Sequence, residues 1–261
     1  MSTVALPRDT DRKAAMLFGI AFDPLTMAEA VNAIVDAARG RRKGLVVTPN
    51  VDHVLMVADD PIVADVYDRA VLRLADGMPI VWVSRLIGGG RRLPERVAGS
   101  DLLGEVCHRA AEAGLTVYFA GGRPGVAERA ATQLVTLYAD LKVVGTDSPP
   151  FGFEHDRTQS ALLASRISMA RPDILFIGVG APKQELWADA HLDTLDCGPI
   201  VCCGAAFDFA AGTARRAPRI ARGLGLEWLW RLLHEPRRLW RRYLVRGPRF
   251  LGIALRELSR R

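Results

Sequence analysis

Residues 173–185 read DILFIGVGAPKQE, and this stretch contains the three parts of a strand-turn-helix unit. In the strand expected at residues 173–178, Asp173 is followed by an apolar run with the length of a buried strand. Gly180 lies in the turn that follows, and Pro182 suits the first turn of a helix. Runs of the strand type also occur at residues 45–48, 71–75, 116–120, 141–145 and 199–203. Amphipathic stretches predict helices at residues 100–113, 126–138, 158–170 and 183–195.

The alternation of these elements, with short connections, predicts an α/β fold. We expect a Rossmann-like, largely parallel sheet flanked by helices. The 261 residues suffice for one large domain, or for a domain with an appendage. Composition divides the chain into a disordered leader at residues 1–13, a Rossmann-like catalytic body at 14–213 and a helical, arginine-rich appendage at 214–261.

The charge of the chain is concentrated in this appendage. Residues 215–261 hold 14 Arg and 3 Glu, a net charge of +11, so the other residues sum to −5 within the total of +6. An apolar stripe accompanies the arginines and consists of Leu226, Leu229, Trp230, Leu233, Trp240, Tyr243 and Leu244. This pattern predicts an amphipathic element that docks on anionic lipid. Nucleic acid is not an expected partner, because the acidic body would repel a polyanion.

Cysteine usage and hydropathy indicate the compartment. Cys107, Cys197, Cys202 and Cys203 show no C-x-x-C spacing, which favours reduced thiols in a core. No apolar run approaches the roughly 18 to 20 residues that span a bilayer, and the first residues show no signal-peptide pattern. We expect a cytoplasmic protein, peripheral on the inner face of the cell membrane. Homo-oligomerisation stays open.

Polar side chains follow the first two expected strands, at the edge where α/β folds bind ligands. Thr48 and Asn50 follow the first strand, Asp76 follows the second, and Arg96 lies nearby in LPERVAGSD. One carboxylate among hydroxyl, amide and guanidinium groups suits a group transfer with a single general base. Asp76 and Asn50 would also serve as N-caps of the helices that follow them. Asp52 and His53, shortly after Asn50, are expected on a helix surface.

Three later turns also predict ligand contacts. Gly121 and Gly122 open a helix after a strand, so their backbone N–H groups suit a diphosphate. Gly180 lies in a second turn of this type, and Gln184 can reach back from the helix toward a ligand. Asp208 follows the last strand, where it would bind a ribose or uracil or act as a turn residue.

Seven motifs resemble the WecG/TagA/CpsF family of bacterial glycosyltransferases (glycosyltransferase family 26). They span roughly residues 17 to 246 in the order TPNVDHV, ADGMPIVWVSRL, LPERVAGSDLL, YFAGG, FIGVGAPKQE, CGAAFDFAAGTARRAPR and GLEWLWRLLHEPRRLWRRYL. The resemblance implies that Asp76 is the catalytic base. It places Thr48, Asn50, Arg96 and Gln184 in the substrate pocket, and it implies that Arg231, Arg238 and Arg241 complete the site over the donor diphosphate.

The resemblance also implies a reaction. A hexose would move from a UDP-sugar to a sugar acceptor linked to undecaprenyl diphosphate, in surface polysaccharide biosynthesis. N-acetylmannosamine is the favoured donor sugar, with glucose and N-acetylmannosaminuronic acid as alternatives. A single base with no carboxylate nucleophile predicts inversion at the anomeric carbon. No Asp-x-Asp pair follows any strand, so we expect no metal and no cofactor, with arginine in place of the cation.

Two other classes of protein stay open at this point. A Rossmann-like oxidoreductase or methyltransferase would need a dinucleotide fingerprint or an acidic ribose-binding residue after the first strand, and neither is evident. A non-catalytic, membrane-associated nucleotide-binding protein would not need Asp76, Thr48 and Gln184 together.

Overall fold

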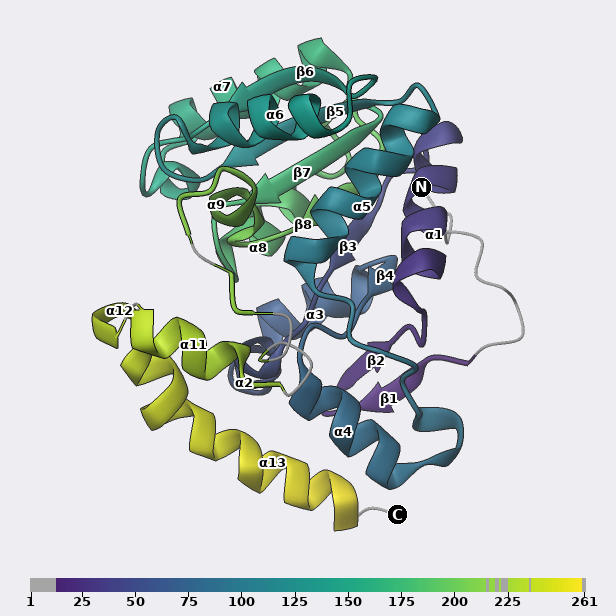
Figure 1. The fold of residues 1–261 in the computed structure, drawn as a ribbon, viewed down its shortest axis with the longest axis vertical. Coiled ribbons are helices and arrows are strands. Elements are labelled where there is room, and N and C mark those ends of the chain that lie inside the picture. Colours follow the sequence, from purple (N-terminus) through teal and green to yellow (C-terminus); the bar gives the residue numbers. More distant parts are fainter. Residues whose placement is uncertain (1–12, 215, 219–220, 222–224, 235, 260–261) are drawn as a thin grey trace.

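The centre of the molecule is a six-stranded sheet, shown in Figure 1. The computed structural model describes residues 13–214, 216–218, 221, 225–234 and 236–259, except the side chains of Arg231, Arg238, Arg242 and Tyr243. The strand order is β4-β3-β8-β7-β5-β6, and every neighbouring pair is parallel. The strands are β3 (Leu45–Val47), β4 (Leu72–Arg73), β5 (Thr116–Gly121), β6 (Lys142–Asp147), β7 (Ile174–Gly178) and β8 (Ile200–Cys202). The predicted Rossmann-like α/β fold is therefore confirmed.

Helices cover both faces of this sheet. One face packs against α1 (Met27–Arg39), α5 (Gly99–Glu112), α6 (Val126–Leu137) and α9 (Ala206–Ala210). The other packs against α2 (Val51–Asp59), α3 (Pro61–Arg69), α4 (Met78–Ile87), α7 (Arg157–Ala170) and α8 (Lys183–His191). Short 3₁₀ turns occur at η1 (Gly89–Arg91) and η2 (Phe153–His155). Burial on both faces explains why the strands are continuous apolar runs.

A short hairpin precedes the sheet and was not predicted. It pairs β1 (Ala15–Leu17) with β2 (Ile20–Phe22) in antiparallel register. Phe18 and Gly19 form the turn with φ values of 55° and 79°. Arg73 ties the hairpin to the sheet, because its Nε donates to the Ala21 carbonyl at 2.6 Å and its Nη2 lies 3.4 Å from the buried Asp23 carboxylate. The hairpin thereby extends the core beyond the sheet.

The C-terminal residues fold back along the body (Figure 1). Their elements are α11 (Glu227–His234), α12 (Pro236–Trp240), the π-helical η3 (Arg241–Arg246) and α13 (Gly247–Ser259). The ring of Phe250 lies 5.3 Å from that of Phe18 in the hairpin, and Phe250 is buried. Arg249 donates twice to Asp59, at 2.6 and 3.0 Å. None of the described helices combines the length and apolar character needed to cross a bilayer.

Candidate active site

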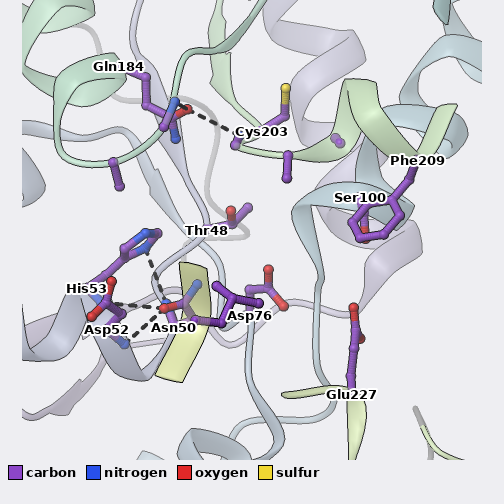
Figure 2. Close-up of a pocket in the computed structure, with 16 residues that line it drawn as sticks. Thr48, Asn50, Asp52, His53, Asp76, Ser100, Gln184, Cys203, Phe209 and Glu227 are labelled. Carbon is purple, nitrogen blue, oxygen red and sulfur yellow. Dashed lines mark hydrogen bonds between the residues drawn. The ribbon is translucent and has the colours of Figure 1, made fainter. Parts of the chain in front are cut away.

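A cavity of about 340 Å³ opens at the carboxyl ends of the central strands. Its size falls in the range of small-ligand sites, which is about 300–1,000 Å³. Described residues that line it come from the body and from the appendage. They are Thr48, Asn50, Asp52, His53, Asp76, Ser100, Gly180, Ala181, Gln184, Cys203, Gly204, Ala205, Ala206, Phe209, Glu227 and Leu239. Figure 2 shows their side chains around a common space.

Asp76 lies where β4 runs into α4. Its backbone N–H donates to the Pro49 carbonyl at 2.9 Å, which continues the pairing of the two strand ends. Its Oδ2 accepts a hydrogen bond of 3.4 Å from the N–H of Gly99, at the beginning of α5. A helix N-terminus favours a carboxylate. Gly77, and not Asp76, is the N-cap residue of α4.

Arg96 lies beside the cavity, although it is not among the residues that line it, and backbone pairing of its neighbour holds it there. The Val97 N–H donates to the Ala75 carbonyl at 2.8 Å, and this places Arg96 beside Asp76. Its guanidinium is only 15% exposed and lies near the carboxylates of Glu227, Asp101 and Asp76, at 2.7, 3.5 and 4.0 Å. Burial disfavours the charged guanidinium, but these carboxylates outweigh burial and raise the pKa of Arg96. Arg96 therefore stays charged beside the cavity.

Thr48 and Asn50 both line the cavity, and each has a structural role there. The Thr48 hydroxyl lies 3.5 Å from the Cys202 carbonyl. A Cβ atom on Gly99 would lie 2.9 Å from the Thr48 Oγ1, so a side chain at this position would have to displace the Thr48 hydroxyl. The Asn50 Oδ1 accepts from the N–H of Asp52 at 2.9 Å and caps α2. The capping interpretation of Asn50 is confirmed, and the side chain borders the pocket as well.

Asp52 and His53 correct the prediction that they lie on a helix surface. Each is 8% exposed, and both line the cavity (Figure 2). The His53 Nδ1 accepts from the Asn50 N–H at 3.3 Å, which closes a capping box. Arg246 of the appendage lies 3.7 Å from the Asp52 Oδ1. The Asn50 cap is the signal for this position, because α2 begins at Val51 and its second and third residues line the cavity.

Gln184 joins two of the turns that border the cavity. Its Oε1 accepts from the N–H of Gly180 at 3.3 Å and from the N–H of Gly204 at 3.2 Å. Its Nε2 donates to the Glu185 Oε1 at 2.8 Å. Glu185 is buried, and burial raises its pKa to about 7, although the hydrogen bond from Gln184 opposes this increase. Glu185 was not singled out in the sequence.

Gly121, Gly122 and Asp208 lie at this edge of the sheet but, like Arg96, do not line the cavity. A Cβ on Gly121 would lie 2.4 Å from the Gly178 carbonyl oxygen, so this glycine permits two strands to approach closely. Gly122 donates its N–H to the same carbonyl at 3.0 Å. Asp208 lies inside α9 rather than in a turn, and its Oδ1 accepts from the Thr213 hydroxyl at 3.3 Å.

The arginines predicted over the diphosphate are seen only in part. The side chains of Arg231 and Arg238 lie outside the described residues. Arg241 is exposed, and its guanidinium carbon lies 5.4 Å from the centre of the Trp240 ring. Among the described residues, no group of three or more His, Cys, Asp or Glu side chains is arranged to hold a metal ion. The four cysteines are buried and carry no disulfide.

The fold and the cavity define a Rossmann-like protein with a ligand site at the carboxyl edge of its sheet. Comparison with protein families identifies the class of reaction. The chain matches the glycosyl transferase WecG/TagA/CpsF family over residues 15–261, and it belongs to this family. The protein is therefore a glycosyltransferase, and its substrates are a sugar donor and an acceptor.

Proposed function

We propose that the protein is an inverting, metal-independent hexosyltransferase. It moves a hexose, with N-acetylmannosamine favoured, from a UDP-sugar to a sugar acceptor linked to undecaprenyl diphosphate, in surface polysaccharide biosynthesis. Family membership supports the sugar transfer. The observation that carries the chemistry is the position of Asp76, a carboxylate that lines the cavity at the end of a strand. The identity of the donor sugar rests on the family resemblance.

Asp76 acts as the general base in this proposal. Its carboxylate takes the proton of the acceptor hydroxyl while that oxygen attacks the anomeric carbon. The new glycosidic bond forms on the face opposite the departing UDP, so one displacement inverts the anomeric configuration. Two further carboxylates line the cavity, but Glu227 lies 2.7 Å from Arg96 and Asp52 lies 3.7 Å from Arg246. Their ion pairs make them poor nucleophiles, which supports a single displacement.

Cationic and N–H groups bind the donor in this proposal. The turn at Gly180 and the residues before α9 line the cavity, as does Gln184, and Arg96 lies beside it, 4.0 Å from Asp76. Gly121, Gly122 and Asp208 lie along the same edge and are proposed to hold the nucleotide. Arg231, Arg238 and Arg241 are proposed to close over the diphosphate, since a guanidinium pairs with phosphate oxygens through two hydrogen bonds.

The appendage presents an apolar surface that suits a membrane. Its exposed large apolar side chains are Leu226, Trp228, Leu229, Leu233, Trp240, Leu244, Val245, Leu251 and Leu255, and α4 adds Trp82 and Leu86. Exposed arginines accompany them, including Arg237, Arg241 and Arg249. Tryptophan and leucine with arginine are typical of an interfacial element on anionic lipid. We propose that this surface rests on the inner membrane face and brings the lipid-linked acceptor to the cavity.

An assay with purified protein tests this proposal. A panel of UDP-sugars is incubated with a short acceptor linked to a lipid diphosphate, and UDP release and the anomeric configuration of the product are measured. We expect release that requires both substrates, is largest with UDP-N-acetylmannosamine, and gives an inverted product. The same rate is expected with excess EDTA. Loss of activity in EDTA with rescue by Mg²⁺ or Mn²⁺ would contradict metal independence, and a retained configuration would contradict the single displacement.

A further inference from the structure

The appendage places a carboxylate inside the pocket of the body. Glu227 is the first residue of α11, its side chain is 18% exposed, and it lines the cavity. The Nη1 of Arg96 donates to its Oε2 at 2.7 Å, across 131 residues of sequence. In Figure 2 the carboxyl groups of Glu227 and Asp76 lie on the same side of the cavity. Glu227 is thus a link between the appendage and the proposed base.

The contacts of Arg96 show what this link does. The Nη1 that donates to Glu227 also lies nearest to Asp76, 4.0 Å from its Oδ1, which is beyond hydrogen-bond distance. The other terminal nitrogen, Nη2, lies 3.5 Å from the Asp101 Oδ2. Glu227 and Asp101 therefore set the orientation of the guanidinium. The positive charge of Arg96 lies 4.0 Å from the Asp76 carboxylate, and Arg96 makes no direct hydrogen bond to it.

A direct pair between Arg96 and Asp76 would hinder catalysis by this base. Guanidinium and carboxylate groups pair through two parallel hydrogen bonds when nothing else holds them, and such pairs are among the strongest in proteins. A carboxylate whose oxygens both accept from arginine has fewer lone pairs for an incoming hydroxyl proton. The strongest competitor in this structure is Glu227, because it makes the shortest contact with Nη1.

We propose that Glu227 is a positioning residue that holds Arg96 off Asp76, so that the Asp76 carboxylate can accept the proton of the acceptor. This inference rests on the proposed role of Asp76 as the base. Docking of the appendage then does more than cover the cavity, because it brings the group that sets the geometry of Arg96.

Glu227 is not the main anchor of the appendage. Phe250 is buried against Phe18, and Arg249 pairs with Asp59. Glu257, near the end of α13, is buried and lies 3.5 Å from Arg91. Neither Glu257 nor Arg91 lines the cavity. Glu257 is therefore a matched control, since it is another glutamate of the appendage that pairs with an arginine of the body.

The test compares Glu227→Gln with Glu257→Gln in the full-length protein. Steady-state kinetics with UDP-sugar and lipid-linked acceptor give kcat and both KM values, and melting and vesicle binding report on fold and docking. Removing a general base costs about 10²–10⁴ in rate, so partial obstruction of it should lower kcat at least about tenfold. We expect this loss in Glu227→Gln, with KM values, melting and vesicle binding close to those of the wild type. Glu227→Asp, which keeps the charge, should lose less.

Several outcomes would overturn the inference. One is a wild-type kcat in Glu227→Gln, and another is an equal loss of kcat in Glu227→Gln and Glu257→Gln, which would reduce Glu227 to an anchor. If Glu227→Gln melts early, an equal loss in a normally folded Glu227→Asp would also count against it. Asp76→Asn separates this inference from the proposed function. If Asp76→Asn is active, Asp76 is not the base, and the proposed function fails together with this inference. If Asp76→Asn is inactive while Glu227→Gln is active, only the role of Glu227 is contradicted.

Discussion

The body and the appendage of this protein are held together by different forces. In the body, strand residues such as Phe119, Phe176 and Val201 are fully buried, and helices cover both faces of the sheet. In the described appendage, Leu239, Phe250 and Ala254 are buried, while a larger set of apolar side chains is exposed. Burying a Leu or Phe side chain contributes about 1.5–3 kcal/mol. Packing stabilises the body throughout, and it stabilises the appendage at few points.

The two regions also contribute different parts of the candidate active site. The strands of the body fix the backbone of Asp76 through its bond to Pro49, and Gln184 ties the turns of the body around it. The appendage adds Glu227 and Leu239 to the cavity wall, and its pair between Arg249 and Asp59 lies at the exposed surface, where salt screens it. A body that folds alone but catalyses poorly follows from this division.

Deleting residues 214–261 has the largest expected effect. We expect a folded body that binds UDP weakly and transfers no sugar, because the deletion removes Glu227, Leu239 and all but one of the arginines predicted to contact substrate or lipid. Thermal melting and circular dichroism check the fold, and calorimetry with UDP checks binding. Transfer at the wild-type rate by the truncated protein would show that the body is a complete enzyme. It would contradict the division of the site between body and appendage.

Asp76→Asn tests the body alone. The change keeps the size of the side chain and an oxygen that can accept from the Gly99 N–H. We expect an unchanged melting temperature and UDP affinity, with kcat lower by about 10²–10⁴, because the amide cannot accept the proton of the acceptor. Steady-state kinetics on the lipid-linked acceptor measure the loss. Turnover like that of the wild type would remove Asp76 from the mechanism.

Single Arg→Ala changes at Arg231, Arg238 and Arg241 test the appendage alone. If these arginines contact the donor diphosphate, each change should lower transfer several-fold and raise the KM for the UDP-sugar. Vesicle binding should weaken little, because 13 of the 14 arginines in residues 215–261 remain and each contributes only about 1 kcal/mol at an anionic surface. The reverse result, intact transfer with weak vesicle binding, would make the appendage a membrane anchor alone.

Much of the body could be predicted from its sequence. The buried parallel strands are continuous apolar runs, and each of the six expected strands is present. The helix expected at residues 183–195 ends at His191, and β4 keeps only Leu72–Arg73 as regular strand. The β1–β2 hairpin was missed because it lies outside the alternation of strands and helices, although its strands are as long as β3 and β8. Its stability comes from tertiary contacts such as the pair between Arg73 and Asp23.

The site was predictable where a strand ends in a polar residue, and less so elsewhere. Thr48, Asn50, Asp76 and Gln184 all line the cavity, because the carboxyl ends of parallel strands converge. Glu227 was missed, since its contact with Arg96 joins segments 131 residues apart. No local pattern records such a contact. Glu185 was missed for a different reason, because a glutamate in the first turn of a helix normally faces solvent.

The smallest predicted effect concerns this buried glutamate in the interior of the body. Glu185 is 1% exposed, and burial raises its pKa from 4.5 to about 7. Between these values the folded protein binds a proton that the unfolded chain has released, so the free energy of unfolding falls as pH rises from 4.5 to 7. Above pH 7 the loss is complete and stays constant.

Glu185→Gln should remove this pH-dependent loss, because the amide resembles the protonated acid and its oxygen can still accept from the Gln184 Nε2. We expect equal melting temperatures at pH 4 and a gain for the variant that grows between pH 4.5 and 7. Above pH 7 the gain should reach about 1–3 kcal/mol, given about 1.4 kcal/mol for each pKa unit. Melting of both proteins from pH 4 to 8.5 measures this difference, with pH 4 as the internal control.

A difference that does not vary with pH, or a variant less stable than the wild type above pH 7, would mean that the interior of the body stabilises the Glu185 carboxylate in its charged form. Charged groups would then stabilise the interior of the body, as surface ion pairs stabilise the appendage. The two regions would differ less in the forces that hold them.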